Sequence, residues 1–239
     1  MTPVKRNLLI WVLGILGGGW LCMSASSCGK ATTGSPQLLN IQYHVLNLSP
    51  DLLPVDLFVD IRQVNTSPYY FAIDQGYFYI PSTDTPYQIR SAINTGTTWL
   101  HRDDILQSGA KYTLYITGAV ADGSLTSLLT VDTGFSPPAG TGGLRLVNVS
   151  PTATGGITVY ANGTTTKDFT GVSYQQVSNY DYLPAGNYDL QVVATGTTTI
   201  LSEQPSVTIQ NGRLYTIYAY GYTSRADSAG FATQVTRNQ

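Results

Sequence analysis

One strand–break–strand pattern occurs twice in this chain. Leu144–Gly163 reads LRLVNVSPTATGGITVYANG, and a diverged copy, IQYHVLNLSPDLLPVDLFVDIRQV, spans Ile41–Val64. In both copies, alternating apolar residues predict a strand, and Asn-x-Ser-Pro ends it because proline has no N–H to donate to a sheet. A second alternating segment follows. The duplication favours two domains of similar structure over one large domain.

Later segments of the two copies also correspond. Tyr112–Gly118 (YTLYITG) matches Tyr215–Gly221 (YTIYAYG) in spacing, and Leu183–Leu190 parallels Ile80–Ile89, with two extra residues in the first copy. Only 11% of the 239 residues are charged, and each copy has short strands at the spacing typical of sandwiches. No segment resembles the helix that a crossover between parallel strands requires. We therefore predict an all-β protein of two tandem antiparallel β-sandwiches.

Composition sets the expected domain limits. Residues 134–143, GFSPPAGTGG, combine two prolines with four glycines and are predicted to form a linker. The first sandwich is then expected over residues 38–133 and the second over residues 144–239. We expect a signal peptide at residues 1–27 and a short flexible tether at residues 28–37.

The N-terminal segment has the features of a secretory signal. Lys5 and Arg6 precede an apolar run from Leu8 to about Leu21, which is too short and glycine-rich to span a bilayer comfortably. Removing this leader takes the 12 basic and 14 acidic groups to 10 and 14, a net charge of −4. Such a charge offers no basic surface for nucleic acid.

The segment from Ala25 to Cys28 resembles the lipobox of bacterial lipoproteins. In that motif signal peptidase II cuts before the cysteine, whose sulfur carries diacylglycerol; Ala25 departs from the usual leucine. Cys22 leaves with the leader, so Cys28 would be the only cysteine of the mature chain and could form no internal disulfide. Attachment to a membrane through Cys28 is the expected role. An ordinary cleaved signal peptide with an incidental cysteine is the alternative.

Four motifs of the second copy resemble the bacterial secreted family called domain of unknown function 4397. They are LVNVSP (146–151), ITVYANG (157–163), YLPAGNYDL (182–190) and YTIYAYG (215–221). The first copy matches more loosely, with Ile80–Thr83 in place of Leu-Pro-Ala-Gly. The resemblance implies immunoglobulin-like β-sandwiches in an envelope or extracellular setting, and it carries over no catalytic residue. The tyrosine before the last strand resembles a corner tyrosine, whose hydroxyl bonds to backbone.

No residue cluster in the chain indicates a reaction. There is no GxSxG, P-loop or dinucleotide motif, and His44 and His101 lack zinc-site spacing. A calcium site at Asp51, Asp56 and Asp60 is a weak alternative, because no calcium-binding loop surrounds them. We expect no enzyme, no cofactor and no metal. A cryptic hydrolase is kept only as a remote alternative.

The tyrosines are the most suggestive residues for binding. Many of the seventeen are expected on strand faces opposite the core, including Tyr115, Tyr160, Tyr218 and Tyr220. Exposed rings there could stack on sugars or anchor a protein partner, although cross-strand pairing is a purely structural alternative. Asp227-Ser228-Ala229 also resembles a short bacterial O-glycosylation motif, with Ser228 as the acceptor.

These features predict a non-enzymatic lipoprotein of the cell envelope. Its two domains would act as an interaction, adhesion or spacer module, and the alternative is a carbohydrate-binding lipoprotein that uses exposed tyrosines. We expect the lipid to hold it at the outer membrane, on either the periplasmic or the surface side. A protein or glycan ligand is left unidentified.

Overall fold

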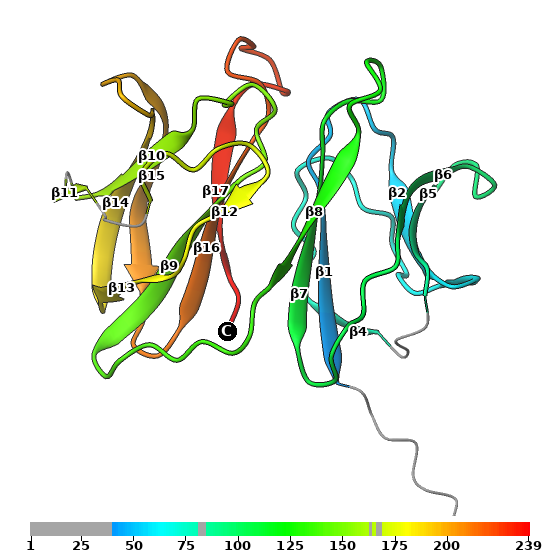
Figure 1. Ribbon diagram of the computed structural model, residues 1–239, viewed down its shortest axis with the longest axis horizontal. Helices are drawn as coiled ribbons and strands as arrows, with labels where there is room; N and C mark the ends of the chain where they lie inside the picture. The colour runs from blue at the N-terminus through cyan, green and yellow to red at the C-terminus, as the bar shows by residue number, and fades with distance from the viewer. Residues whose placement is uncertain (1–39, 81–84, 163, 166–168) are drawn as a thin grey trace, which may run out of the picture. The chain divides into compact units, whose positions relative to one another are not determined.

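The computed structural model describes residues 40–80, 85–162, 164–165 and 169–239, and every regular element in these segments is a β-strand (Figure 1). These segments contain no helix that is long and apolar enough to cross a membrane. The predicted signal peptide, Cys28 and the tether lie outside the described residues. Both repeats belong to one compact unit that extends to Gln239.

The first repeat is a sandwich of two four-stranded sheets. Sheet A has the order β4-β1-β7-β8 and sheet B the order β3-β2-β5-β6. Apolar residues of β1 and β7 meet those of β2 and β5 in a core that includes Val45, Leu57, Ile89 and Leu114. The strands are β1 (Ile41–Asn47), β2 (Val55–Val59), β3 (Arg62–Gln63), β4 (Phe78–Ile80), β5 (Tyr87–Ser91), β6 (Thr98–Arg102), β7 (Lys111–Thr117) and β8 (Thr126–Val131).

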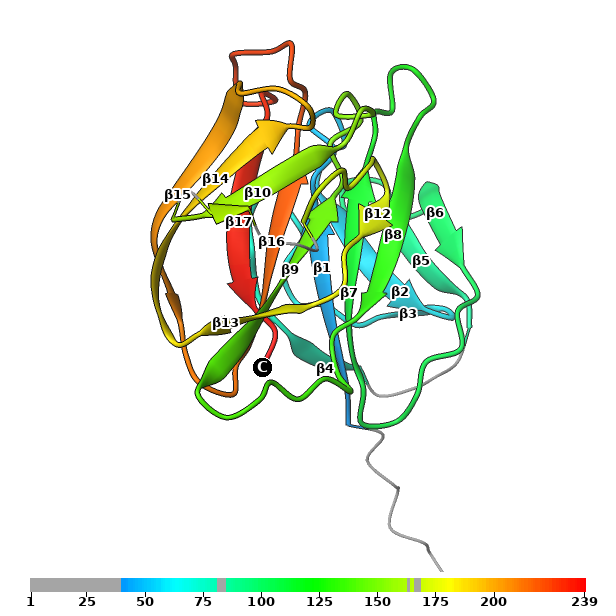
Figure 2. The same ribbon diagram turned by 60° about the vertical axis from the view of Figure 1, so that its left-hand side comes forward.

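The second repeat has the same two-layer architecture (Figure 2). Sheet C has the order β12-β9-β16-β17, with β13 also paired to β9, and sheet D the order β11-β10-β14-β15. Its core includes Leu146, Val159, Val192 and Ile217. The strands are β9 (Thr141–Asn148), β10 (Ile157–Ala161), β11 (Thr164–Thr165), β12 (Gln176–Val177), β13 (Asp181–Pro184), β14 (Gly186–Ala194), β15 (Ile200–Ile209), β16 (Leu214–Tyr220) and β17 (Ala232–Arg237).

The all-β prediction is confirmed, but the pairing is not entirely antiparallel. In each repeat the first strand runs parallel to a late one: β1 pairs with β7, and β9 pairs with β16. No crossover helix is needed, because the strands of the opposite sheet lie between the two partners in the chain and make the connection. The immunoglobulin-like details of the topology stay a prediction.

The asparagine of each Asn-x-Ser-Pro motif fastens the turn that follows it. Asn47 and Asn148 are fully buried. The amide nitrogen of Asn148 donates to the carbonyl oxygens of Ala153 (3.3 Å) and Val172 (2.8 Å), and its side-chain oxygen accepts the N–H of Ser150 at 3.0 Å. Asn47 makes the equivalent three bonds in the first repeat. The motif therefore specifies the same local structure twice.

The tyrosine at the start of β7 and of β16 also behaves alike in both repeats. The backbone N–H of Gln107 donates to the hydroxyl of Tyr112 at 2.9 Å, and that of Gln210 to the hydroxyl of Tyr215 at 3.2 Å. Each bond ties the loop before the strand to the strand itself. This is the side-chain–backbone contact that the resemblance to a corner tyrosine implied.

Two glycines of the predicted linker are strand residues. β9 begins at Thr141, so Gly142 and Gly143 lie within it and are buried. A Cβ on Gly142 would come within 2.6 Å of the carbonyl oxygen of Gln210, and one on Gly143 within 2.7 Å of Leu214 Cδ2. These glycines permit close packing rather than flexibility. The connection between β8 and β9 is accordingly shorter than residues 134–143 suggested.

Two strands of the first repeat differ from what their local sequence pattern indicates. Ile61 is 75% exposed, although it continues the apolar face of β2, because Asp60 adopts a φ of 55° and turns the chain after Val59. β6 occupies Thr98–Arg102, although this segment shows no clear alternation of apolar and polar residues. Pairing with β5 stabilises this segment.

Candidate functional site

The central strands of sheets A and C, which are β1, β7, β9 and β16, are buried on both faces. One face of each contributes to its own sandwich core, and residues of the opposite faces, or directly after those strands, form a third apolar cluster. The first repeat supplies Leu46, Leu48 and Tyr115, and the second supplies Val147, Val149, Tyr218 and Tyr220. This cluster, named here the joint, is a core shared by the two repeats.

Equivalent residues of the two repeats contact each other in the joint. Leu46 pairs with Tyr115 in the parallel register of β1 and β7, and Val147 pairs with Tyr218 in that of β9 and β16. The two tyrosines therefore occupy the same position in their repeats. Their rings pack edge to face, with centroids 5.7 Å apart. The joint thus resembles the interface of a symmetric dimer within a single chain.

The predicted tyrosine surface is largely wrong. Tyr115, Tyr218 and Tyr220 are at most 6% exposed, because the other repeat covers the face that was expected to meet solvent. Burial raises the pKa of Tyr115 and of Tyr218. Only Tyr160, on β10, is partly exposed. The structure therefore does not bring the four rings together as a binding platform on the surface.

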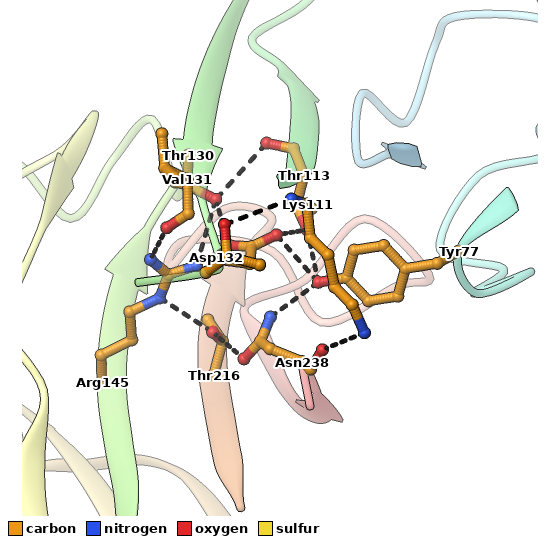
Figure 3. Close-up of polar contacts among 10 residues, drawn as sticks. Tyr77, Lys111, Thr113, Thr130, Val131, Asp132, Arg145, Thr216 and Asn238 are labelled. Carbon is orange, nitrogen blue, oxygen red and sulfur yellow. Dashed lines mark hydrogen bonds and ion pairs between the residues drawn. The ribbon is translucent and has the colours of Figure 1, made fainter. Parts of the chain in front are cut away.

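A buried polar network lies next to the apolar joint, with Asp132 at its centre (Figure 3). Its carboxylate accepts hydrogen bonds from the hydroxyls of Thr113 (2.6 Å), Thr130 (2.9 Å) and Tyr77 (2.8 Å). All of these residues belong to the first repeat. The pKa of Tyr77 is raised, first by burial and then by the charge of Asp132.

Arg145 of the second repeat completes this network. Its guanidinium forms an ion pair with Asp132 and donates to the carbonyl oxygen of Val131 at 2.9 Å and to the hydroxyl of Thr130 at 3.1 Å. The Nε of Arg145 donates to Thr216 at 2.9 Å. Burial opposes its charge, but the pKa of Arg145 is raised because Asp132 stabilises the charged form. Removing either partner would leave a buried charge without its counterion.

Asn238 joins the repeats from the equivalent position. The backbone N–H of Asp132 donates to the carbonyl oxygen of Lys111, the first residue of β7, at 2.8 Å. The backbone N–H of Asn238 donates to the carbonyl oxygen of Leu214, the first residue of β16, also at 2.8 Å. Asp132 and Asn238 therefore occupy equivalent positions in the two repeats. The side chain of Asn238 donates to the Tyr77 hydroxyl at 2.8 Å, and Lys111 Nζ donates to the carbonyl oxygen of Asn238 at 3.0 Å.

His44 occupies the position in β1 that Arg145 occupies in β9. Its Nε2 lies 2.8 Å from Asp74 Oδ1, and that oxygen also accepts the backbone N–H of Gly76 at 2.8 Å. Burial alone would raise the pKa of Asp74, but its bonds to His44, Gly76 and Thr236 lower it. His44 thus pairs with a residue of its own repeat, whereas Arg145 contacts the other repeat directly.

The other polar residues considered as sites have structural contacts. Asp51 accepts the N–H groups of Val120 (2.9 Å) and Ala121 (2.8 Å), and these bonds lower its pKa although burial opposes the shift. Asp56 is buried and accepts a bond from Asn65. His101 lies on the surface beside Asp103. Among the described residues, no group of three or more His, Cys, Asp or Glu side chains could hold a metal ion.

Ser228 lies in the exposed loop between β16 and β17. The carboxylate of the preceding Asp227 pairs with Arg225 and accepts the N–H of Ala229 at 3.1 Å, so the backbone around Ser228 is held in a defined turn. The serine is accessible to a modifying enzyme. Cys28, the predicted lipidation site, lies outside the described residues.

The comparison with known families fits the duplicated fold. A family model described as a domain of unknown function, DUF4397, matches residues 42–155 and again residues 152–239. The chain belongs to the DUF4397 family. The first DUF4397 match continues through β9, although that strand pairs with β12, β13 and β16 of the second sandwich. Among curated proteins, no match to this DUF4397 chain is found.

Sequence reasoning missed the buried polar network beside the joint. One signal was present, because Arg145 stands alone within the apolar strand LRLVNV. A charged residue there requires a partner if both strand faces are buried. Nothing in the sequence indicated Asp132 as that partner.

Proposed function

We propose that this DUF4397 protein is a non-enzymatic lipoprotein of the cell envelope whose paired sandwiches form a stiff spacer or interaction module. The joint is the observation that supports this role. An apolar cluster and a buried ion pair both link the repeats, so a hinge motion would expose apolar surface and separate buried charges. The repeats are then expected to move together.

The membrane part of the proposal rests on the N-terminal sequence. Lipid at Cys28 would hold the protein at the outer membrane, and the residues before Asn40 would separate the lipid from the first strand. A stiff body on a short flexible tether would display its loops within a limited distance of the bilayer. The partner is proposed to be a protein or a glycan, with no role for nucleic acid.

The anchor is tested by replacing its cysteine. Cys28→Ser should abolish palmitate labelling and move the protein from the membrane to the soluble fraction. Labelling and fractionation that match the wild type would rule out lipidation at Cys28.

The stiffness of the joint needs its own experiment. Spin labels at the exposed positions Thr66 and Thr197, in a background that carries Cys22→Ser and Cys28→Ser, should give one narrow distance distribution by pulsed electron paramagnetic resonance. Adding Arg145→Met should broaden it, because the ion pair is lost. A broad distribution before that change would contradict a stiff spacer.

Glycan binding through Tyr115, Tyr218 and Tyr220 has no support in the structure, since these rings are buried. A glycan ligand would have to use other side chains.

A further inference from the structure

We propose that a groove at the open edge of the first sandwich binds a neutral oligosaccharide. This site goes beyond the spacer role and does not depend on it. The groove lies between the segment that follows β3 and the segment that leads into β4, and its volume is about 290 Å³. Its walls include Asn65, Thr66, Ser67, Gln75, Phe78 and Tyr79.

The walls of the groove are braced by internal hydrogen bonds. The side-chain oxygen of Asn65 accepts the N–H of Leu57 at 2.8 Å, and its amide nitrogen donates to Asp56 at 2.7 Å. On the opposite wall, Gln75 Nε2 donates to the carbonyl oxygen of Pro68 at 2.7 Å and links the two segments. The groove is therefore preformed, as most small-ligand sites are.

Tyr79 supplies an accessible aromatic ring. The residue is 65% exposed, and its hydroxyl accepts a hydrogen bond from Gln42 Nε2 at 2.7 Å, which fixes the ring position. The buried Tyr69 forms the floor and contacts Phe78, with ring centroids 6.3 Å apart. An exposed ring of fixed position offers a large apolar face at little further entropic cost.

The other polar side chains of the groove are suited to form hydrogen bonds with the hydroxyl groups of a ligand. Within the described part of the chain, the exposed hydroxyls of Thr66 and Ser67 and the side-chain oxygen of Gln75 make no hydrogen bond. They can donate to or accept from a ligand. The described lining contains no charged side chain, which favours a neutral ligand over an ion.

A neutral sugar combines the two properties that this groove complements. Its C–H faces pack on an aromatic ring, and its hydroxyls bond to side-chain amides and hydroxyls. The groove volume is at the lower end of the range for ligand sites. It would therefore hold a short stretch of a longer chain.

The test uses the whole protein in detergent on an array of neutral and charged oligosaccharides, followed by calorimetry with the best neutral ligand. We expect binding to neutral glycans, with Tyr79→Ala weakening the affinity about tenfold or more. Gln75→Ala should also weaken it, because the variant loses both the bond to Pro68 and an acceptor for the sugar.

Tyr70→Ala provides the matched control, because Tyr70 is 51% exposed but does not line the groove. It should bind like the wild type, and the melting temperatures of all variants should agree. Absence of neutral-glycan binding, a preference for charged glycans or for peptides, or an affinity unchanged by Tyr79→Ala would each overturn the proposal.

Discussion

Tyr115 of the first repeat and Tyr218 of the second occupy equivalent strand positions and pack edge to face, with ring centroids 5.7 Å apart. Both are almost completely buried. Since each repeat offers the same tyrosine to the other, the contact is nearly symmetric even though both repeats belong to one chain. The ion pair between Arg145 and Asp132 breaks that symmetry, because His44 and Asn238 occupy the equivalent positions.

The tyrosine pair should be important for stability rather than for binding. Tyr115→Ala or Tyr218→Ala should each lower the free energy of unfolding by about 3–5 kcal/mol, as for other large buried rings. The double variant should lose less than the sum, because the rings contact each other. Denaturant unfolding measures this, with exposed Tyr70→Ala as the control. Wild-type stability in the two single variants would show that the joint contributes little.

The ion pair should show strong coupling. Arg145→Met alone should cost about 3–5 kcal/mol, because it leaves the buried carboxylate of Asp132 without its counterion. In Arg145→Met/Asp132→Asn the buried charge is gone, so the combined cost should be smaller than the sum of the two single costs. A double-mutant cycle from denaturant unfolding gives this coupling, and strictly additive costs would refute it.

Acid should destabilise the protein through Asp51 and Asp74. Both carboxyl groups have a pKa below the ordinary value of 3.8, so the folded state binds protons less readily than the unfolded state. Their contribution is present above pH 3.8 and is lost as the pH falls through the folded pKa.

Unfolding followed between pH 7 and pH 2 should show this loss, with a shallower slope below pH 4 for Asp51→Asn. Asp60→Asn, in an exposed turn, is the control. The idea fails if the Asp51 variant keeps the full slope.

The buried tyrosines of the joint, Tyr115 and Tyr218, should ionise at a higher pH than exposed tyrosines do. Burial raises the pKa of Tyr115 and Tyr218, so the neutral form stabilises the fold below the unfolded value of 10. That stability is lost as the pH rises above 10. Absorbance at about 295 nm, the wavelength of the tyrosinate band, should show fewer ionised tyrosines in the native protein than in denaturant, until unfolding releases the rest. Full ionisation near pH 10 without unfolding would contradict the burial.

The glycine that directly follows β16 should tolerate no side chain. Gly221 has a φ of 77°, and a Cβ there would lie 2.2 Å from the carbonyl oxygen of Gly230. Gly212 has a φ of 71° but open space around it, so Gly212→Ala carries only the backbone strain of about 1–2 kcal/mol. Gly221→Ala should therefore lower the melting temperature considerably more, and equal shifts would contradict the role of the contact.

Local features of the fold could be predicted from the sequence. The alternation in Ile41–Asn47 and the proline after it indicate the first strand, and Asn162 adopts a positive φ of 50°, which asparagine before glycine in a turn favours. The parallel pairing of β1 with β7 could not be derived, because the partners are far apart in the chain. The glycines at 142 and 143 were misread, since composition does not separate close packing from flexibility.

The sequence by itself determined that the chain is all-β, that it is duplicated, and which residues end the strands, because alternation, proline and asparagine act over a few neighbouring positions. Only the tertiary structure decided whether the second face of sheets A and C meets water or another sheet. Alternation shows that a strand has two faces, but it cannot show what covers either one. For Tyr115 and Tyr218 the cover is the other repeat, and this contact changed predicted binding residues into core residues.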